Sequence, residues 1–208
     1  MKKIYLLMGI FMLFLAIPGY TQVNLGIVGG INIANATVDP DQGADWKSIT
    51  GLGIGVVVDL KMGEMMMLHL EPMYLQKGSK AEEGENKVEM LVDYLEIPVM
   101  LKYQFGTSTT KPYFMAGPSI GFLLDSKLKI TEDGTSGETD NKDDTESIDF
   151  GIGIGAGLDM MVGKNTFFVE ARYAFGMVNV NASDEEDEPD IKTKGIQIFV
   201  GFTFPLGR

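Results

Sequence analysis

His69 is the only histidine of the chain, and Glu71 follows it at the two-residue spacing that places both side chains on one face of a β-strand. A histidine beside a carboxylate can act as the general base of a Ser-His-acid site. However, we expect no Gly-x-Ser-x-Gly nucleophile elbow in this chain, and no serine lies obviously opposite His69. Cysteine is absent, which excludes a Cys nucleophile and Cys-ligated metals. The sequence therefore predicts no enzyme and no cofactor, and it assigns His69 a hydrogen-bonding role.

Ionisable residues recur on the equivalent face of several other segments, where they alternate with large apolar residues. If that face points into a narrow interior, water is scarce there and buried charges must pair with one another. We expect Arg172 and Lys102 to hold the glutamates among them in a salt-bridge plug. A narrow, gated polar path is the alternative, which no residue pattern favours. The predicted interior charges are Asp59, His69, Glu71, Glu96, Lys102, Asp159, Glu170 and Arg172.

Two acidic segments are weak candidates for cation binding. Asp39, Asp41 and Asp45 are spaced like part of a calcium-binding loop, and residues 184–190 form a denser acidic run. Neither segment has the full ligand pattern that ends in a bidentate glutamate. Because runs of like charge are usually solvated and extended by self-repulsion, no metal site is predicted. The alternative is weak calcium or magnesium binding, shared with lipopolysaccharide phosphates.

Alternating apolar and small or polar residues run through most of the chain, a period that fits β-strands and not helices. Residues 88–95 also fit helical spacing, but the regular alternation from Leu95 to Tyr103 favours a strand over the whole segment. The segments predicted as strands are residues 24–33, 51–60, 65–77, 88–104, 112–130, 150–160, 167–177 and 196–204.

The N-terminus has the pattern of a secretory signal peptide. Two lysines at residues 2–3 precede an uninterrupted apolar run over residues 4–17. The run is shorter than the roughly 20 residues that a membrane-spanning helix needs. We expect cleavage near Thr21, so that residues 1–21 are the signal peptide and residues 22–208 form one β-barrel domain.

Short and long connections alternate strictly between the predicted strands. All long connections therefore fall at one end of an up-and-down meander, which is the arrangement of outer-membrane barrels with short periplasmic turns and longer external loops. The long connections hold most of the 29 acidic residues, so the acidity is concentrated at the external pole. The short connections are residues 61–64, 105–111 and 163–165, and the long ones are 35–48, 78–89, 131–149 and 181–192.

The two faces of the strands set the polarity of the barrel. Large apolar residues on one face are matched by glycines on the other, as in residues 51–55 and 151–157. Glycine suits a crowded lumen, where it leaves room for larger side chains from neighbouring strands. We therefore predict an all-β, eight-stranded antiparallel up-and-down transmembrane β-barrel, OmpA/OmpX-like, located in the cell outer membrane. A soluble, lipocalin-like lipid-binding barrel is the less favoured alternative.

The segment Tyr94–Tyr103 is similar to the core Y-L-E-I-P-x-x-L-K-Y of PorT-type outer-membrane β-barrels of Bacteroidetes. Pro112–Gly121 resembles that family's next strand and Glu71–Gly78 the strand before it, so the likeness covers essentially the whole mature chain. The resemblance implies an outer-membrane barrel domain and carries no catalytic residues. One departure is the C-terminus, which continues past Phe204 to Arg208 instead of ending on an aromatic residue.

The net charge of −12 argues against nucleic-acid binding, which needs a basic surface. The expected partners are outer-membrane lipid and lipopolysaccharide, together with a protein bound at the loops or at the periplasmic turns. We expect a monomer. The predicted function is a non-enzymatic structural or surface-interaction role with acidic extracellular loops. An accessory component of an envelope secretion or transport machine, as the PorT resemblance implies, is the alternative.

Overall fold

The computed structural model describes residues 22–39, 46–84, 86–132, 135–182 and 189–206. The predicted signal peptide, residues 1–21, lies outside this part of the chain. Every regular element of the described residues is a β-strand, and no helix among them is long and apolar enough to cross a membrane. The strands are β1 (Val23–Asp39), β2 (Trp46–Lys61), β3 (Met66–Leu70), β4 (Met73–Glu83), β5 (Asn86–Gln104), β6 (Thr110–Glu132), β7 (Thr135–Asp140), β8 (Ile148–Val162), β9 (Asn165–Gly176) and β10 (Asp190–Leu206).

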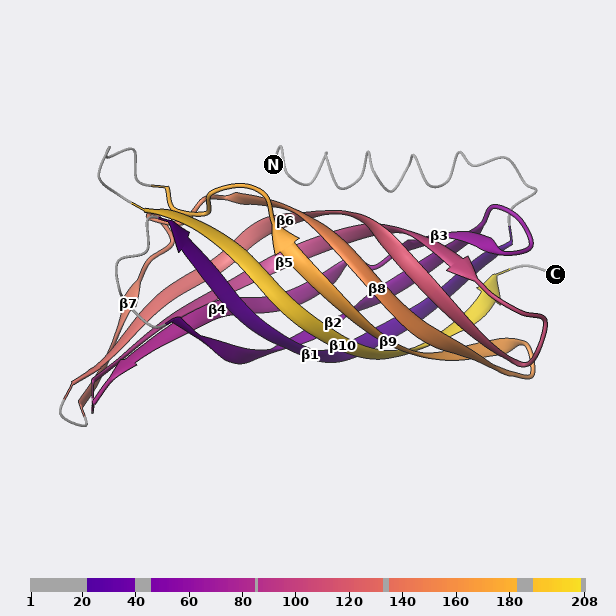
Figure 1. Ribbon diagram of the computed structural model, residues 1–208, viewed down its shortest axis with the longest axis horizontal. Helices are drawn as coiled ribbons and strands as arrows, with labels where there is room; N and C mark the ends of the chain where they lie inside the picture. The colour runs from indigo at the N-terminus through magenta and orange to yellow at the C-terminus, as the bar shows by residue number, and fades with distance from the viewer. Residues whose placement is uncertain (1–21, 40–45, 85, 133–134, 183–188, 207–208) are drawn as a thin grey trace.

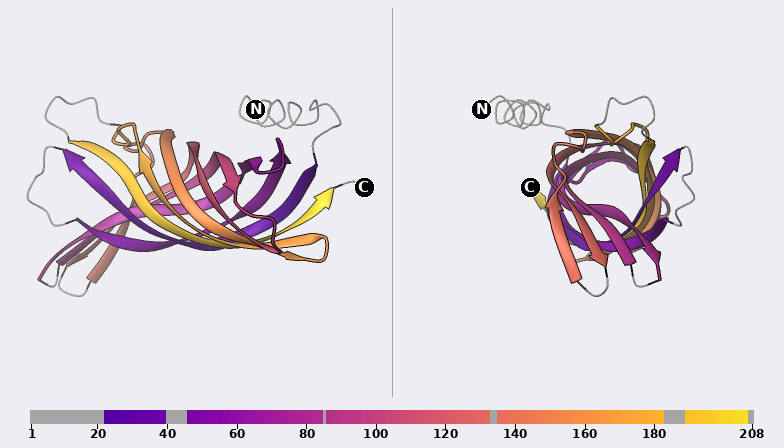
Figure 2. Two further views of the ribbon diagram at one scale, coloured as in Figure 1. Left: turned by 45° about the vertical axis from the view of Figure 1, so that its right-hand side comes forward. Right: turned by 90° about the vertical axis from the view of Figure 1, so that its left-hand side faces the viewer.

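The strands form one antiparallel sheet that closes into a barrel (Figures 1 and 2). β1 pairs with β2, and both β3 and β4 pair with β2 on one side and with β5 on the other. β5, β6, β8, β9 and β10 then pair in order, and β10 pairs back onto β1 along its whole length. Since β3 and β4 share one position and β7 pairs only with β6, the described wall has eight strand positions, as predicted.

The wall remains continuous where β3 and β4 are interrupted, at Glu71 and Pro72. Proline has no N–H to donate to the ladder, so regular pairing stops there. The Pro72 carbonyl still accepts a hydrogen bond from the Val56 amide at 3.0 Å, and the Glu71 amide donates to the Pro98 carbonyl at 3.3 Å. Glu71 and His69 are both fully buried, so the interruption does not change which face points inward.

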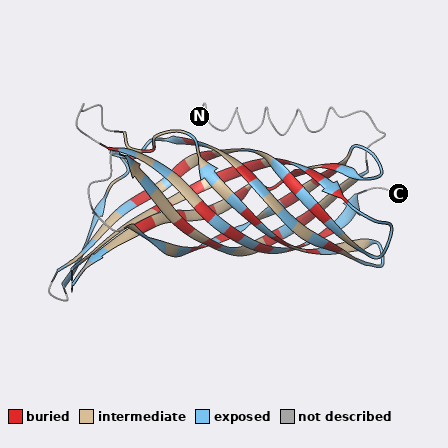
Figure 3. Cartoon of the chain, in the orientation of Figure 1, coloured by how far each residue is buried: buried red, intermediate tan, exposed pale blue. Residues whose placement is uncertain are grey.

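Side chains alternate between a buried and an exposed face along each strand (Figure 3). In β10, Phe199 is fully buried while Ile198 and Val200 are 42% and 48% exposed. Ile27 and Ile54 are each 66% exposed. A continuous apolar outer surface is unfavourable in water and stable against lipid. The barrel therefore has the polarity predicted for a transmembrane protein, which is opposite to that of a lipocalin-like barrel.

Replacing Ile54 with lysine tests the lipid-facing surface, because Ile54 lies halfway along β2 on its outer face. A lysine near the bilayer midplane destabilises such barrels by about 2–4 kcal/mol. We expect a smaller folded fraction after refolding into lipid vesicles, measured as the heat-modifiable band on SDS gels. The control is Thr135→Lys, at an exposed position of β7, which should change stability by no more than about 0.5 kcal/mol. Equal folding of both variants would contradict the assignment.

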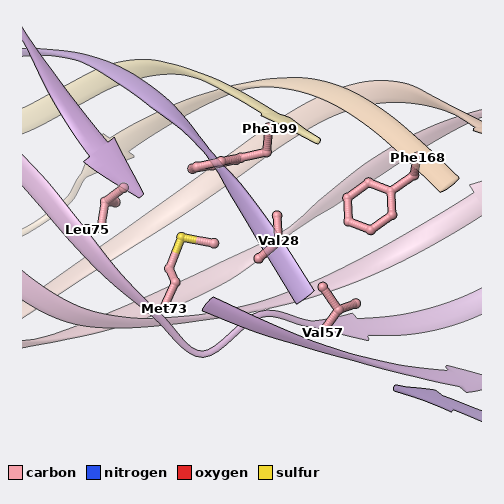
Figure 4. Packing of buried hydrophobic residues seen from close by; sticks show 6 residues of the cluster. All are labelled: Val28, Val57, Met73, Leu75, Phe168 and Phe199. Atoms are coloured by element: carbon pink, nitrogen blue, oxygen red, sulfur yellow. The ribbon is translucent and has the colours of Figure 1, made fainter. Parts of the chain in front are cut away.

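Large side chains fill part of the lumen, and glycines make room for them. Gly53 lies under the Phe199 ring, and a Cβ at Gly201 would overlap the Phe168 ring. A Cβ at Gly157 would likewise overlap the Tyr113 side chain. The glycines therefore have the space-making role that the sequence predicted. The main apolar cluster consists of Val28, Val57, Met73, Leu75, Phe168 and Phe199 (Figure 4).

Two segments predicted as long loops are largely strand, which corrects the prediction. Residues 78–83 form the end of β4 and residues 86–89 the start of β5, and within residues 131–149 the strand β7 pairs with the end of β6. Basic and acidic residues face each other across these strands, as at Lys80 and Glu89. We call the described residues of 78–89 and 126–140 the outer extension; it projects past the ring of strands (Figure 1).

The opposite end of the barrel has the short connections, as predicted. Turns join β2 to β3, β5 to β6 and β8 to β9 there. Val23 pairs with both Leu206 and Leu60, so both ends of the described chain lie at this short-turn end. The outer extension and the ends of the described chain, Val23 and Leu206, are therefore at opposite poles (Figure 1).

Candidate functional site

The lumen holds the ionisable side chains that the sequence placed there. All eight predicted residues are at most 4% exposed, and they come from β2, β3, β5, β8 and β9 and from the junction between β3 and β4. They are not one continuous network but fall into three groups, which we call the histidine group, the Lys102 group and the outer group.

The histidine group is centred on His69. Its Nδ1 lies 2.5 Å from Oδ1 of Asp59, and its Nε2 lies 2.9 Å from Oε1 of Glu71 and 3.9 Å from Oε2 of Glu170. The ring meets Phe168 edge-on, with 5.9 Å between the centroids. Carboxylates from three different wall positions therefore converge on both nitrogens of one imidazole.

Arg172 completes the histidine group. Its Nη2 donates to Oε2 of Glu71 and, at 2.5 Å, to Oε1 of Glu170. The guanidinium also lies over the Phe199 ring, with Cζ 4.9 Å from the centroid. The Tyr113 hydroxyl donates to Oε2 of Glu170 at 2.9 Å. Arg172 thus fixes the two glutamates from the side opposite to His69.

The Lys102 group lies next to it, towards the short-turn end. Lys102 Nζ is 2.8 Å from Oδ1 of Asp159 and 3.7 Å from the centroid of the Tyr113 ring. Gln104 donates to the other oxygen of Asp159. The expectation that Lys102 holds a glutamate is therefore wrong: β6 pairs with β5 on one side and with β8 on the other, and this arrangement brings Asp159 within reach instead.

The outer group contains two residues that sequence reasoning missed. Lys77 pairs with Glu96 and, at 3.1 Å, with Asp149, whose Oδ2 also accepts from the Thr193 hydroxyl at 2.9 Å. Lys77 follows His69 and Glu71 at even spacing on the same face, so alternation alone signalled it. Asp149 was assigned to a loop, and its inward position follows only from the length of β8.

The letters Gly-x-Ser-x-Gly occur at residues 117–121, a match that sequence reasoning overlooked. The segment runs through the middle of β6 and makes no turn between strand and helix, so it is not a nucleophile elbow. Ser119 lines a small recess with Lys77 and Glu96, in the outer group, whereas the ionic partners of His69 are carboxylates of the histidine group. No Ser-His pair is formed in the described lumen.

The weak cation site predicted in the external loops is only partly described. Asp39 is exposed at the end of β1, and Asp41 and Asp45 lie outside the described residues. Of the acidic run at 184–190, residues 184–188 also lie outside them.

The sequence of residues 19–182 matches the family described as outer membrane protein beta-barrel domain. This chain belongs to that family. It is a barrel protein of the outer membrane, and its lumen groups fill the inside of a membrane-spanning wall. A sequence comparison with curated proteins finds no match.

Solved structures of outer-membrane proteins are similar to this family member. The structure of OprG from Pseudomonas aeruginosa has a TM-score of 0.51 and 15% identity, over 91% of this chain and 99% of OprG. Neisserial surface protein A has a TM-score of 0.46 and 12% identity, over 85% of this chain and 95% of that protein. The likeness to OprG shows the shared barrel fold.

Proposed function

We propose that this protein is a non-enzymatic outer-membrane barrel with a sealed lumen, and that its role is structural or is exerted through its external surface. The observation that carries the proposal is the outer extension, in which ordered strands project beyond the ring. The buried ion pairs and aromatic rings of the described lumen support this proposal. Signal-peptide export and monomeric assembly belong to the same proposal.

The outer extension presents a charged sheet face. Across four strands, Lys47 faces Lys80, Lys80 faces Glu89, and Glu89 faces Lys129. Lys129 in turn faces Glu138 of β7. Such a face fits a charged, hydrated ligand, and lipopolysaccharide phosphates or a protein with its own charged surface are the partners we propose.

Ion pairs at the tip of the β4–β5 hairpin persist in acidic medium. Glu82 lies 2.8 Å from Lys80 and 3.1 Å from Lys47. Hydrogen bonds from Lys80 and Lys47 hold the pKa of the Glu82 carboxyl at about 2. Because this pKa is lowered, the pairing is present above the carboxyl's ordinary range and is lost only as the pH falls towards 2. We therefore expect the pairs that Glu82 makes with Lys80 and Lys47 to be retained in mildly acidic surroundings.

Single cysteines test the orientation, since the chain has none of its own. We expect Thr135→Cys, in the outer extension, to react with a membrane-impermeant maleimide on intact cells. Thr107→Cys, in the turn between β5 and β6, should react only after the cells are opened. Labelling in the reverse pattern would show that the extension faces the periplasm and would end the surface proposal.

Conductance in planar bilayers tests the sealed lumen. The purified barrel is expected to give no steps above the background of the bilayer, because charged and aromatic side chains fill its interior. Reproducible steps would favour the alternative of a gated polar path.

A PorT-like accessory role in an envelope secretion or transport machine, in a Bacteroidetes host, is the second candidate. It is favoured by the segment Tyr94–Tyr103 and by a polar recess of about 360 Å³ at the short-turn end, lined among others by Lys61, Glu64 and Lys111. Specific crosslinking of Lys111→Cys to envelope proteins would support this role. Crosslinking only through the outer extension would support the surface role.

A further inference from the structure

The histidine group carries an excess of negative charge. Asp59, Glu71 and Glu170 converge there, and Arg172 is the one permanent cation that contacts them in the described lumen. The neighbouring pair of Lys102 and Asp159 adds one charge of each sign, so it leaves the net charge unchanged. Two negative charges thus remain when His69 is neutral, in a space where unpaired charges are strongly disfavoured.

Four buried atoms of the group make no hydrogen bond of good geometry: Nε2 of His69, Oε1 of Glu71, and Nε and Nη1 of Arg172. Nε2 and Oε1 lie 2.9 Å apart as an ion pair, and His69 and Glu71 are completely buried. One donor atom each from His69, Glu71 and Glu170 can be chosen so that all three lie within 4.8 Å of one another. These are a nitrogen and two carboxylate oxygens, which is a donor set that divalent transition metals bind.

We propose that His69 Nε2, Glu71 Oε1 and Glu170 Oε2 bind one divalent metal ion, with Zn²⁺ as the best match. Zinc binds histidine nitrogen and carboxylate oxygen at about 2.0–2.2 Å, so ligands in a tetrahedral site lie roughly 3.4 Å apart. The separations of Nε2 from the two oxygens, 2.9 Å and 3.9 Å, fall on either side of that value. An ion of charge +2 also cancels the two excess negative charges.

The surrounding residues form the shell that such a site needs. Asp59 accepts from Nδ1 of His69 at 2.5 Å, which fixes the ring tautomer and leaves the Nε2 lone pair for the metal. Arg172 binds the carboxylate oxygens that do not face His69, so it orients both glutamates without blocking the ligand atoms. Metal-binding histidines commonly have a carboxylate partner of this kind.

The test is the metal content of the full mature chain, purified from membranes and also refolded from urea with Zn²⁺ or Co²⁺. Refolding in the presence of metal matters because the site is sealed in the folded barrel. We expect one metal ion per chain by elemental analysis and, with Co²⁺, the visible absorption of a tetrahedral ion. Asp59→Asn should weaken binding roughly 10- to 100-fold, which is typical when a residue that orients a ligand is lost.

Glu170→Gln removes a ligand and should abolish stoichiometric binding, whereas Glu96→Gln, in the outer group, should retain it. Folding of each variant is checked by its heat-modifiable band. Absence of metal and of the cobalt spectrum in the wild-type protein would overturn the proposal, and His69 would then be a protonated partner of Asp59 and Glu71. Equal metal content in wild type and Glu170→Gln would also overturn it, because the ion would be bound elsewhere. The metal content of the wild-type protein tests the proposal even if a variant fails to fold.

Discussion

Replacing Arg172 with methionine is expected to destabilise the barrel more than any other single change in the lumen. Arg172 is 3% exposed and holds Glu71 and Glu170, and its guanidinium covers the Phe199 ring. Methionine retains much of the volume but leaves two buried carboxylates without their cation. Removing one partner of a buried ion pair costs about 3–5 kcal/mol, since the other charge stays buried. That is a large part of the roughly 5–15 kcal/mol that stabilises a typical domain.

The measurement is the urea concentration at which half of the barrel in detergent loses its heat-modifiable band. We expect a large decrease for Arg172→Met and a partial one for Arg172→Lys, because lysine keeps the charge without the planar fork of donors. Lys47→Met is the control: it removes an exposed ion pair, and such pairs contribute at most about 1 kcal/mol. A midpoint for Arg172→Met equal to that of the wild type would mean that water or counter-ions reach the glutamates.

Replacing Gly201 with leucine is expected to block closure of the barrel. A Cβ at Gly201 would overlap the Phe168 ring and also approach the Ile27 carbonyl at 2.8 Å, so both a side chain and the neighbouring backbone resist it. Overpacking a well-filled interior costs about 1–3 kcal/mol or more. We expect little heat-modifiable band after refolding of Gly201→Leu.

A second-site change distinguishes overpacking from a general effect on the strand. If the Phe168 ring is the obstacle, Phe168→Leu should partly restore the folding of Gly201→Ala, with a coupling free energy of about 0.5–3 kcal/mol. Gly137→Ala is the matched control, because no atom lies within 4 Å of the Cβ it would add. Additive effects of the Gly201 and Phe168 changes would show that the two residues do not contact each other in the folded barrel.

The sequence by itself determined the wall of this protein. A period of two over eight segments predicts strands, and a face of large apolar residues opposed by glycines and charges predicts a barrel with lipid outside. The ambiguous segment at residues 88–95 is strand, because the alternation that continues to Tyr103 belongs to the same element, β5. The order of short and long connections also predicted that the ends of the described chain lie at the short-turn end.

The tertiary structure decided which charges meet. Arg172 and Glu71 are 101 residues apart, and Lys102 and Asp159 are 57 apart. Alternation assigns each of them to the lumen but not to a height along its axis, because that height depends on the stagger of all the strands together. For this reason the sequence paired Lys102 with glutamates, and the structure pairs it with Asp159.

The segments predicted as long loops show the same limit. Considered separately, residues 78–89 and 131–149 have the polar composition of loops. The sequence of one segment does not show which charges of another segment will face it. Only when β4, β5, β6 and β7 are in register do Lys80 and Lys129 lie beside Glu89, and Lys129 beside Glu138. The strand pairing turns these expected loops into the outer extension. The histidine group arises in the same way, since Glu170 reaches His69 only across the closed barrel.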